Sequence, residues 1–554
     1  MKIIDELTLY NNAINNFIDF QPKFRNKTKT KKVFFLRNEQ VENFADKINY
    51  YAALSGLKFK ISYSGYDNNL SFKKTNLDVG ILWLDYSSYK INDNFIKWLS
   101  IKAKELSKSC SYVLIKPIIS HNLKYSEIKS VNKKLLKILD TDKILIIDFL
   151  NEYKNLSSQY WDIQRSEVLG TKTSFFGQEF SAKYLGLKIL PSLFCQKIKA
   201  IIFDLDDTLY TGTIGEDGIK KIFLDKNQKV ASKIYTDLSK NGSILSICSK
   251  NNKSDANLVF NKKILNKKIF YPIETNWNLK SFNIMKIQEK LKVSFHNILF
   301  IDNNIAEILE VKKKISNINV FWAKDSLSLL NCLKYYPNIV DYFGAEDKTL
   351  SKKRLSDLKA SLTRQKIFYN SENQNSLKDL RIKIHFKRNN SKEFDRIFSL
   401  TNKVNQFIFN YKRYDKKQLK RYLTEPRKFI YTVSLQDKLS DSGNVAVLYY
   451  RLEKKFLFLD EICISCRALG RNLEDHFIFE PVKELSKIHN IDFLNMSFKI
   501  GPSNTPAKIY FSKLQTKISK ENNSKYTKKI SIDISKLKEI YKKQNFIETR
   551  FLIN

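Results

Sequence analysis

The sequence predicts a multidomain α/β protein with two parallel, doubly wound sheets followed by an α+β domain. Two observations predict this class. Between residues 32 and 322, short runs rich in β-branched and aromatic residues alternate with helical patterns, which is typical of parallel βαβ units. Residues 428–437 and 444–464 are instead long β-like runs in succession, which is typical of an antiparallel meander. The length of 554 residues also exceeds what one hydrophobic core organises.

Four segments are expected along the chain: a first α/β domain (1–190), a second (195–340), a charged helical connector (341–370) and the α+β domain (371–554). Strands of the first domain are expected at 32–37, 58–64, 78–86, 111–118 and 143–149, and helices at 41–55, 93–107 and 126–139. Strands of the second are expected at 197–203, 243–248, 297–301 and 317–322, and helices at 226–240, 279–291 and 304–315. In the last domain, helices are expected at 471–488 and 505–514 around a strand at 491–499.

The chain carries 97 Lys and Arg against 57 Asp and Glu, a formal net charge of +40. Such a charge is typical of nucleic-acid-binding proteins, or it reflects a lysine-rich composition. Lysine, asparagine and isoleucine are abundant throughout, and no helix-turn-helix, zinc-finger or RNP signature is present, so we expect no nucleic-acid partner. A basic surface still speeds encounter with an acidic protein.

The six cysteines are few and unevenly spaced, which argues against a disulfide framework. The first residues lack the pattern of a signal peptide, and no run of about 18 or more uncharged apolar residues occurs. We therefore expect a cytoplasmic protein without a membrane partner.

Reactive side chains follow three of the strands expected in the second domain. Asp204 and Asp206 follow the first, Ser249 follows the second, and Asp302 follows the third. The carboxyl ends of parallel strands meet at one edge of a sheet, where ligands bind in open α/β folds. A single acidic loop is usually only solvated, but the convergence of three strands predicts a site.

The residue types indicate phosphoryl transfer. A carboxylate such as Asp204 can attack phosphorus, and a second carboxyl, Asp206, can move protons. Carboxylates suit Mg²⁺, and the expected ligands are Asp204, Asp206 and Asp302. Ser249 and Lys280 are expected to bind the phosphoryl group. The adjoining polar residues expected to contact the substrate are Thr208, Asn251 and Asn303.

This constellation resembles the haloacid dehalogenase superfamily. Its four motifs are matched in order by DLDDT (204–208), CSKNN (248–252), Lys280 and FIDNN (300–304). The fourth motif commonly has two adjacent acids, whereas Asn303 follows Asp302 here, so the resemblance implies weaker Mg²⁺ binding. The gaps between motifs leave no room for a large cap domain, which makes the site open.

A narrower resemblance is to FkbH-like proteins. DLDDTLYTGTIGEDGI is similar to the family's DLDNTLWGGVIGEDG, and Lys280 lies in the family's setting NWNLK. TNKVNQFIFNYKRY (401–414) and SCRALGRNLED (465–475) resemble KTNQFNLTTRRY and SCRVLGRGVE. The resemblance covers most of the chain. It implies an SGNH-like first domain, a haloacid dehalogenase subfamily IIIC phosphatase domain and a GNAT-like (N-acetyltransferase-like) third domain.

Members of this family include enzymes that take a glyceryl unit from 1,3-bisphosphoglycerate, remove phosphate and load the unit onto the phosphopantetheine thiol of an acyl carrier protein. The resemblance therefore implies a phosphorylated three-carbon substrate, an acyl carrier protein partner and an aspartyl-phosphate. Some members belong to polyketide pathways. The alternatives are a phosphatase acting on a small sugar or polyol phosphate in surface-polysaccharide or secondary metabolism, and a non-catalytic scaffold with a weakened metal site.

Cys248 allows two interpretations. It lies beside Ser249 at a strand end, where nearby cations or Mg²⁺ would activate a thiolate that accepts the glyceryl unit transiently. Alternatively, it is a buried strand cysteine, which is among the most buried residue types. Adjacent strand residues point to opposite faces, so Cys248 and Ser249 need not both face the substrate.

The third domain resembles the GCN5-related N-acetyltransferases, in which an R/Q-x-x-G-x-G/A turn opens a helix and binds a pyrophosphate. The corresponding turn supplies the candidate residues for CoA or phosphopantetheine: Arg467, Gly470, Arg471 and Asn472. Asn472 replaces the final small residue, which disfavours close approach of a pyrophosphate. The alternative is a domain that keeps the shape without the ligand.

SGNH hydrolases need a serine after the first strand and a late Asp-x-x-His. The first strand here ends Leu36-Arg37-Asn38-Glu39, and the late segment reads Trp161-Asp162-Ile163-Gln164. We therefore expect the first domain to have lost hydrolysis and to serve as a docking or lid element.

Overall fold

The structure is a computed structural model of the chain. It describes residues 3–19, 29–66, 70–72, 76–139, 143–164, 166–339, 360, 380–465, 467–469, 471–501, 504–519, 529–544 and 546–552. Apart from residue 360, the connector predicted at 341–370 lies outside this range. The chain divides into two compact units, Met1–Asp347 and Lys348–Asn554, which are described separately.

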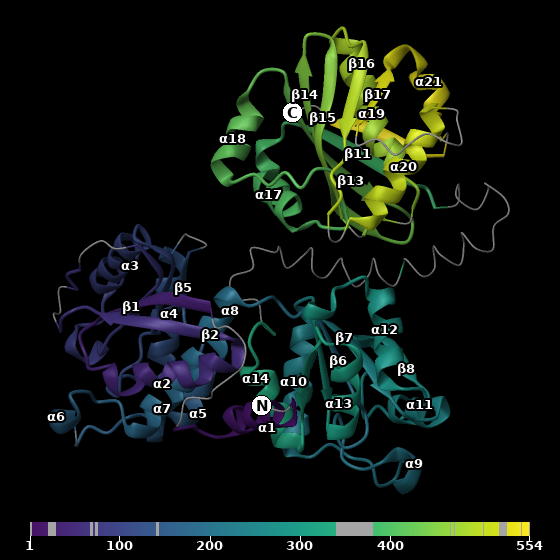
Figure 1. Ribbon diagram of the computed structural model, residues 1–554. Coiled ribbons are helices and arrows are strands. Elements are labelled where there is room, and N and C mark those ends of the chain that lie inside the picture. Colours follow the sequence, from purple (N-terminus) through teal and green to yellow (C-terminus); the bar gives the residue numbers. More distant parts are fainter. Residues whose placement is uncertain are drawn as a thin grey trace. The chain divides into compact units, whose positions relative to one another are not determined.

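The first unit begins with a five-stranded parallel sheet (Figure 1). Its strands, in the order β2-β1-β3-β4-β5, are Leu57–Tyr63, Lys29–Arg37, Leu77–Trp83, Cys110–Ile115 and Ile144–Ile146. The helices between them are α2 (Glu42–Ala52), α3 (Asp93–Ser107) and α4 (Tyr125–Ile138). This arrangement confirms the predicted doubly wound fold.

The second sheet of the first unit is also parallel and has the order β10-β9-β6-β7-β8. These strands are Asn319–Trp322, Ile298–Asp302, Ala200–Phe203, Ile244–Ser249 and Phe270–Thr275. The helices that follow its strands are α10 (Lys226–Lys240), α11 (Lys253–Asn261), α12 (Lys280–Leu291), α13 (Ile305–Lys314) and α14 (Ser326–Tyr335). Strand β8 was not predicted; it contains Pro272, which it tolerates as an edge strand of the sheet.

Helix α1 (Ile3–Asn15) joins the two sheets of the first unit, beside α14 (Figure 1). The Asn11 side chain donates to the Trp322 carbonyl (2.7 Å), and the Asn15 side chain donates to Ser328 Oγ (3.0 Å). At the end of α1, the buried Lys183 Nζ donates to the Ile14 carbonyl (2.7 Å). One apolar cluster contains side chains of both sheets, so they share a core.

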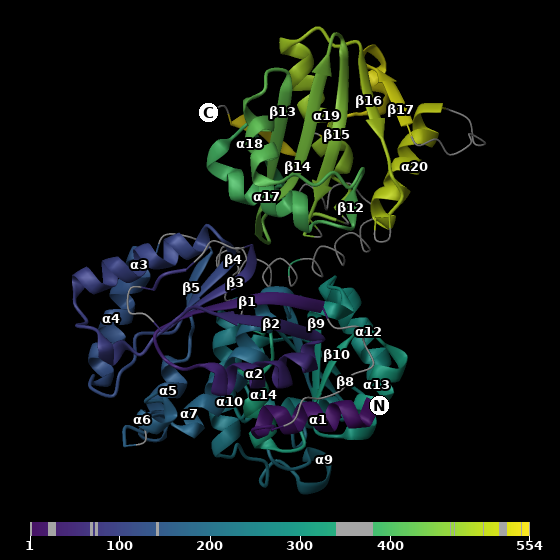
Figure 2. The same cartoon turned by 60° about the vertical axis from the view of Figure 1, so that its left-hand side comes forward.

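The second unit contains a mixed sheet in the order β17-β16-β15-β14-β13-β11-β18, and a short strand, β12, also pairs with β15 (Figure 2). Strands in chain order are β11 (Lys383–Arg388), β12 (Phe407–Ile408), β13 (Lys428–Gln436), β14 (Asp441–Glu453), β15 (Phe456–Ile464), β16 (Phe493–Ser497), β17 (Lys529–Asp533) and β18 (Glu548–Leu552).

Helices cover both faces of this mixed sheet. Helices α17 (Phe394–Lys403) and α18 (Lys416–Thr424) pack on one face, and α19 (Glu474–Ile488) packs on the other. The predicted meander and the last two predicted helices, α19 and α20 (Thr505–Ser519), are confirmed. Within the described residues of both units, no helix combines the length and apolar character needed to cross a bilayer.

Candidate active site

Three neighbouring strands of the second sheet bring the predicted site residues together. Strand β6 is central, with β9 on one side and β7 on the other. Asp204 directly follows β6, Asp302 ends β9 and Ser249 ends β7. Because all three strands run parallel, these side chains lie at one edge of the sheet, where the sequence predicts the site.

Lys280 lies between two carboxylates at this edge. It is the first residue of α12, and its Nζ is 2.7 Å from Asp204 Oδ1 and 2.6 Å from Asp302 Oδ2. Asp204, Lys280 and Asp302 are 5%, 4% and 0% exposed. Burial lowers the pKa of Lys280, but the two carboxylates outweigh burial and raise it above its usual range. Burial, together with Asp204, raises the pKa of Asp302.

Asp206 is held in a second cluster. Its Oδ1 accepts hydrogen bonds from Tyr210 Oη (2.6 Å) and from the Ile214 amide (3.1 Å). Its Oδ2 accepts from Asn251 Nδ2 (3.0 Å), which also donates to Ser249 Oγ (3.0 Å). Both carboxylate oxygens of Asp206 thus act as hydrogen-bond acceptors in this cluster. Tyr210 was missed in the sequence, because its partner is set by the turn and not by a motif.

Thr208 and Asn303 have a positioning role in the structure. The Asn303 amide donates to the buried Thr208 Oγ1 (3.2 Å), and the Asn303 carbonyl accepts from Trp322 Nε1 (2.9 Å). These contacts join the loop after β9 to the loop after β6 and to the end of β10. The substrate contact predicted for both residues therefore stays a prediction.

The three predicted metal ligands do not assemble as one cluster of side chains. Among the described residues, no three His, Cys, Asp or Glu side chains are grouped so that they could hold a metal. Asp206 instead accepts hydrogen bonds from Tyr210 and Asn251, and Asp204 and Asp302 remain as the candidate metal ligands. This donor set still fits Mg²⁺, which commonly uses one or two carboxylates with waters and phosphate oxygens. Asp204 Oδ2 accepts no hydrogen bond within the described structure and is available for such a role.

Cys248 has the surroundings of a structural residue. Its side chain is fully buried, and its Sγ lies 3.8 Å from the Lys280 backbone carbonyl, to which it donates. Burial raises the pKa of the thiol well above its usual range, although Lys280 acts in the opposite direction. A neutral, enclosed thiol is a poor nucleophile. The structure thus favours the buried strand cysteine over the acyl acceptor.

Side chains of the turn expected to bind CoA contact other residues of the second unit. Arg471 is buried, with Nη1 3.0 Å from Asp437 Oδ2 and Nη2 2.9 Å from Ser442 Oγ. Arg467 Nη2 donates to the Asn444 carbonyl (3.4 Å). Asn472 adopts a left-handed φ of 53°, and Gly470 lies outside the described residues. The charge of Arg471 is thus directed at the protein's own groups.

A buried ion pair lies at the carboxyl ends of the strands of the first sheet. Glu39, just after β1, accepts from the fully buried Lys116 Nζ (2.6 Å) and from Thr171 Oγ1 (2.7 Å). The loss of hydrolysis expected for this domain stays a prediction. The ion pair was missed in the sequence, because Glu39 and Lys116 are far apart in the chain and belong to no motif.

Comparisons with known proteins gave likenesses in structure only. No family model matches the chain, and no curated protein matches it in sequence. Forty-two chains of solved structures match. One is the N-terminal part of the protein BF1531 from Bacteroides fragilis, containing a phosphatase domain complexed with Mg; it is 16% identical, covers 60% of this chain and 99% of its own, and has a TM-score of 0.47.

Two further similar structures are acetyltransferases. The ribosomal-protein-S18-alanine N-acetyltransferase of Escherichia coli is 11% identical, covers 24% of this chain and 76% of its own, and has a TM-score of 0.19. The spermidine N-acetyltransferase of Vibrio cholerae, in complex with CoA and spermine, is 12% identical, covers 28% of this chain and 97% of its own, and has a TM-score of 0.22.

Replacing Lys280 by Met should make stability depend strongly on pH. Without the cation, Asp204 and Asp302 repel each other, so the folded chain keeps a proton that the unfolded chain releases near pH 4. Because the folded state then binds more protons, stability falls as pH rises from about 5 to 8. We expect a loss of about 3 kcal/mol or more at the upper pH, measured by denaturant unfolding at both.

Two controls accompany this prediction. The double variant Lys280→Met/Asp302→Asn removes the repulsion and should recover most of the loss at the higher pH. Lys250→Met breaks a partly exposed pair with Glu307 and should change stability little at either pH. An equal loss for Lys280→Met at both pH values would contradict the assignment of Lys280 as the balancing charge.

Proposed function

We propose that the first unit is a Mg²⁺-dependent enzyme that removes phosphate from its substrate through an aspartyl-phosphate on Asp204. The observation that carries this proposal is the buried Lys280 between Asp204 and Asp302, beside hydroxyl and amide groups at the end of β7. A fixed cation and neutral donors at a sheet edge suit a transferring phosphoryl group, whose charge is spread over its oxygens. Mg²⁺ bound by Asp204 and Asp302 would supply further positive charge.

In the first step, a carboxylate oxygen of Asp204 forms a bond to phosphorus while the bond from phosphorus to the leaving oxygen breaks. That oxygen takes a proton that Asp206 carries into the step, and the second step returns a proton to Asp206. In the second step, Asp206 accepts a proton from water, whose oxygen attacks phosphorus and releases inorganic phosphate and the Asp204 carboxylate. Lys280 neutralises charge at Asp204 throughout, and Ser249 and Asn251 are placed to donate to phosphoryl oxygens.

The proposed substrate is a phosphorylated three-carbon acyl compound of the 1,3-bisphosphoglycerate type, and the proposed acceptor is an acyl carrier protein. The carrier thiol attacks the acyl carbon, the bond to the acyl phosphate breaks, and phosphate leaves with the thiol proton transferred to it or to solvent. The remaining phosphomonoester is hydrolysed at Asp204. The buried Cys248 supports direct transfer to the carrier, without an enzyme-bound thioester.

The rim of the site supports a protein acceptor. Only a four-residue helix, α9 (Ile214–Asp217), lies between β6 and α10, so no cap domain is inserted there. Trp277 Nε1 donates to Asn252, the residue after Asn251, which places the indole at the rim. Large exposed apolar side chains follow Trp277 (69%) in the chain, just before and within the first half of α12: Leu279 (52%), Phe282 (46%) and Met285 (41%). Such a patch is typical of a protein contact, and the net charge of +40 favours an acidic partner.

The two rival functions differ in what they require. A phosphatase acting on a small sugar or polyol phosphate needs the Asp204 site but no carrier protein. A non-catalytic scaffold needs neither, and Asn303 after Asp302 is the sequence feature that favours it. The exposed rim beside an open site favours a macromolecular acceptor over a small free substrate.

Asp204→Asn should abolish phosphate release, because the amide cannot form the covalent intermediate. We expect a decrease of at least about 10³-fold in the rate with Mg²⁺ and a phosphorylated substrate, measured as inorganic phosphate. Asp237→Asn, which changes an exposed acid on α10, should retain the rate. Residual release above one tenth of wild type would place the nucleophile elsewhere.

Trp277→Ala combined with Phe282→Ser should slow carrier loading. Loss of two exposed apolar contacts should cost at least about 1.4 kcal/mol, or tenfold, in the apparent affinity for holo acyl carrier protein. The rate is followed by intact mass of the carrier with freshly generated 1,3-bisphosphoglycerate. Ile488→Ser, an equally exposed apolar change in the second unit, is the matched control. Unchanged loading in the double variant would exclude this rim as the carrier contact.

A further inference from the structure

Strands β15 and β16 of the second unit run parallel and then separate. Residues Phe456–Leu459 of β15 pair with Phe493–Met496 of β16. Beyond Leu459, β15 continues to Ile464, and its other edge stays paired with β14. A separated strand edge offers backbone N–H and C=O groups to an extended ligand. A pantetheine arm is such a ligand, because its two amides are spaced along an extended chain.

A segment of the protein itself occupies this edge. Strand β12 pairs antiparallel with the end of β15, with Phe407 opposite Ile464 and Ile408 opposite Cys463. From the side of β16, the Lys499 amide donates to the Phe409 carbonyl (2.8 Å), and Asn504 Nδ2 donates to the Ile408 carbonyl (3.0 Å). The segment 407–412 is therefore bonded to β15 and to the residues that follow β16.

A buried carboxylate on β15 accepts hydrogen bonds from the backbone of the same segment. Glu461 is fully buried and accepts from the backbone amides of Phe409 (2.9 Å), Asn410 (3.0 Å) and Lys412 (2.7 Å). Burial raises the pKa of Glu461, and these amide hydrogen bonds act against that rise. The carboxylate is fully used within the chain, so it is not available as a general base.

Close packing keeps the segment in place. A Cβ atom at Gly501 would lie 2.2 Å from a ring carbon of Tyr411, so glycine is needed for this approach. Ser497 Oγ also donates to Asn410 Oδ1 (3.1 Å). Ser497 is the last residue of β16 and Gly501 follows that strand, so both contacts lie where an inserted ligand would need room.

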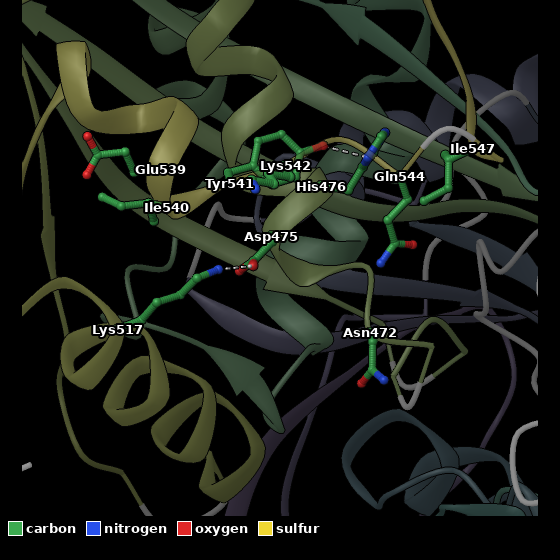
Figure 3. A pocket seen from close by; sticks show the side chains of 10 residues that line it. All are labelled: Asn472, Asp475, His476, Lys517, Glu539, Ile540, Tyr541, Lys542, Gln544 and Ile547. Carbon is green, nitrogen blue, oxygen red and sulfur yellow. Dashed lines mark hydrogen bonds and ion pairs between the residues drawn. The ribbon is translucent and has the colours of Figure 1, made fainter. Parts of the chain in front are cut away.

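The pocket next to the N-terminus of α19 does not provide another site for the cofactor. It has a volume of about 310 Å³, and its charged lining residues are Asp475, Lys517, Glu539 and Lys542 (Figure 3). Two acids and two bases give no net charge. His476 is bonded through its ring nitrogens to Tyr541 Oη (2.7 Å) and Thr549 Oγ1 (2.8 Å), and burial lowers its pKa to about 4, so it stays neutral. The pocket therefore lacks the positive charge that a pyrophosphate needs.

We infer that the second unit binds neither CoA nor a free pantetheine arm, because its own segment 407–412 fills the sheet edge that such a cofactor would use. Arg471, paired with Asp437, is also unavailable to a pyrophosphate. The unit is thus a closed scaffold, and any acyl transfer by this protein proceeds without acyl-CoA. This inference is independent of the function proposed for the first unit.

Ligand binding and backbone protection of the full chain test this inference together. In about 1 mM CoA or acetyl-CoA we expect no thermal shift, whereas a ligand with a Kd near 10 μM would stabilise the chain by about 2.7 kcal/mol. Hydrogen exchange of peptides covering 405–413 should be slow and equal with and without CoA. Thermal stabilisation by CoA, or faster exchange of these peptides in its presence, would overturn the inference.

The variant Glu461→Gln tests whether the Glu461 carboxylate holds segment 407–412 in place. Its amide has one acceptor oxygen in place of two, so peptides covering 405–413 should exchange faster than in wild type. Lys412→Ala keeps the backbone amides and should leave their exchange slow. Unchanged exchange in Glu461→Gln would show that the carboxylate does not hold the segment and would overturn this part of the inference.

Discussion

The placement of Lys280 between Asp204 and Asp302 is the constraint on which the candidate site depends. The three charges come from the end of β6, the end of β9 and the start of α12, and all are buried. A buried cation needs its carboxylates, and two adjacent carboxylates need their cation. Strands β6 and β9 must therefore be neighbours, and α12 must begin at the residue that faces them. The site thus has two carboxyl groups for one lysine, which suits a site that also takes up Mg²⁺.

Two buried carboxylates at the other two sheets are occupied by groups of the protein itself. Glu39 and Lys116 pair at the edge of the first sheet, and Glu461 is occupied by backbone amides in the second unit. At the edge of β6, by contrast, Asp204 retains an oxygen without a hydrogen bond in the described structure. Groups placed for chemistry are thus concentrated at one of the three sheets. The first sheet shares a core with the sheet that carries the candidate site, so it contributes to the stability of this unit.

The sequence was informative where chemistry follows a strand end. Asp204, Ser249 and Asp302 could be placed at one edge, because parallel strands align their carboxyl ends. It was less informative where partners are distant in the chain. The hydrogen bonds of Asp206 to Tyr210 and Asn251 depend on the turn after β6. The burial of Cys248 depends on how α12 packs. Strand β12 has only two residues, which is too short for any periodic pattern.

Trapping of the covalent intermediate tests the central claim most directly. The protein would be mixed with Mg²⁺ and a phosphate-labelled substrate, quenched in acid and digested. We expect a labelled peptide that contains Asp204, with a linkage cleaved by hydroxylamine, as for an acyl phosphate. Phosphate release without any covalent label at Asp204 would show that water attacks the substrate directly, and it would contradict the role assigned to this carboxylate.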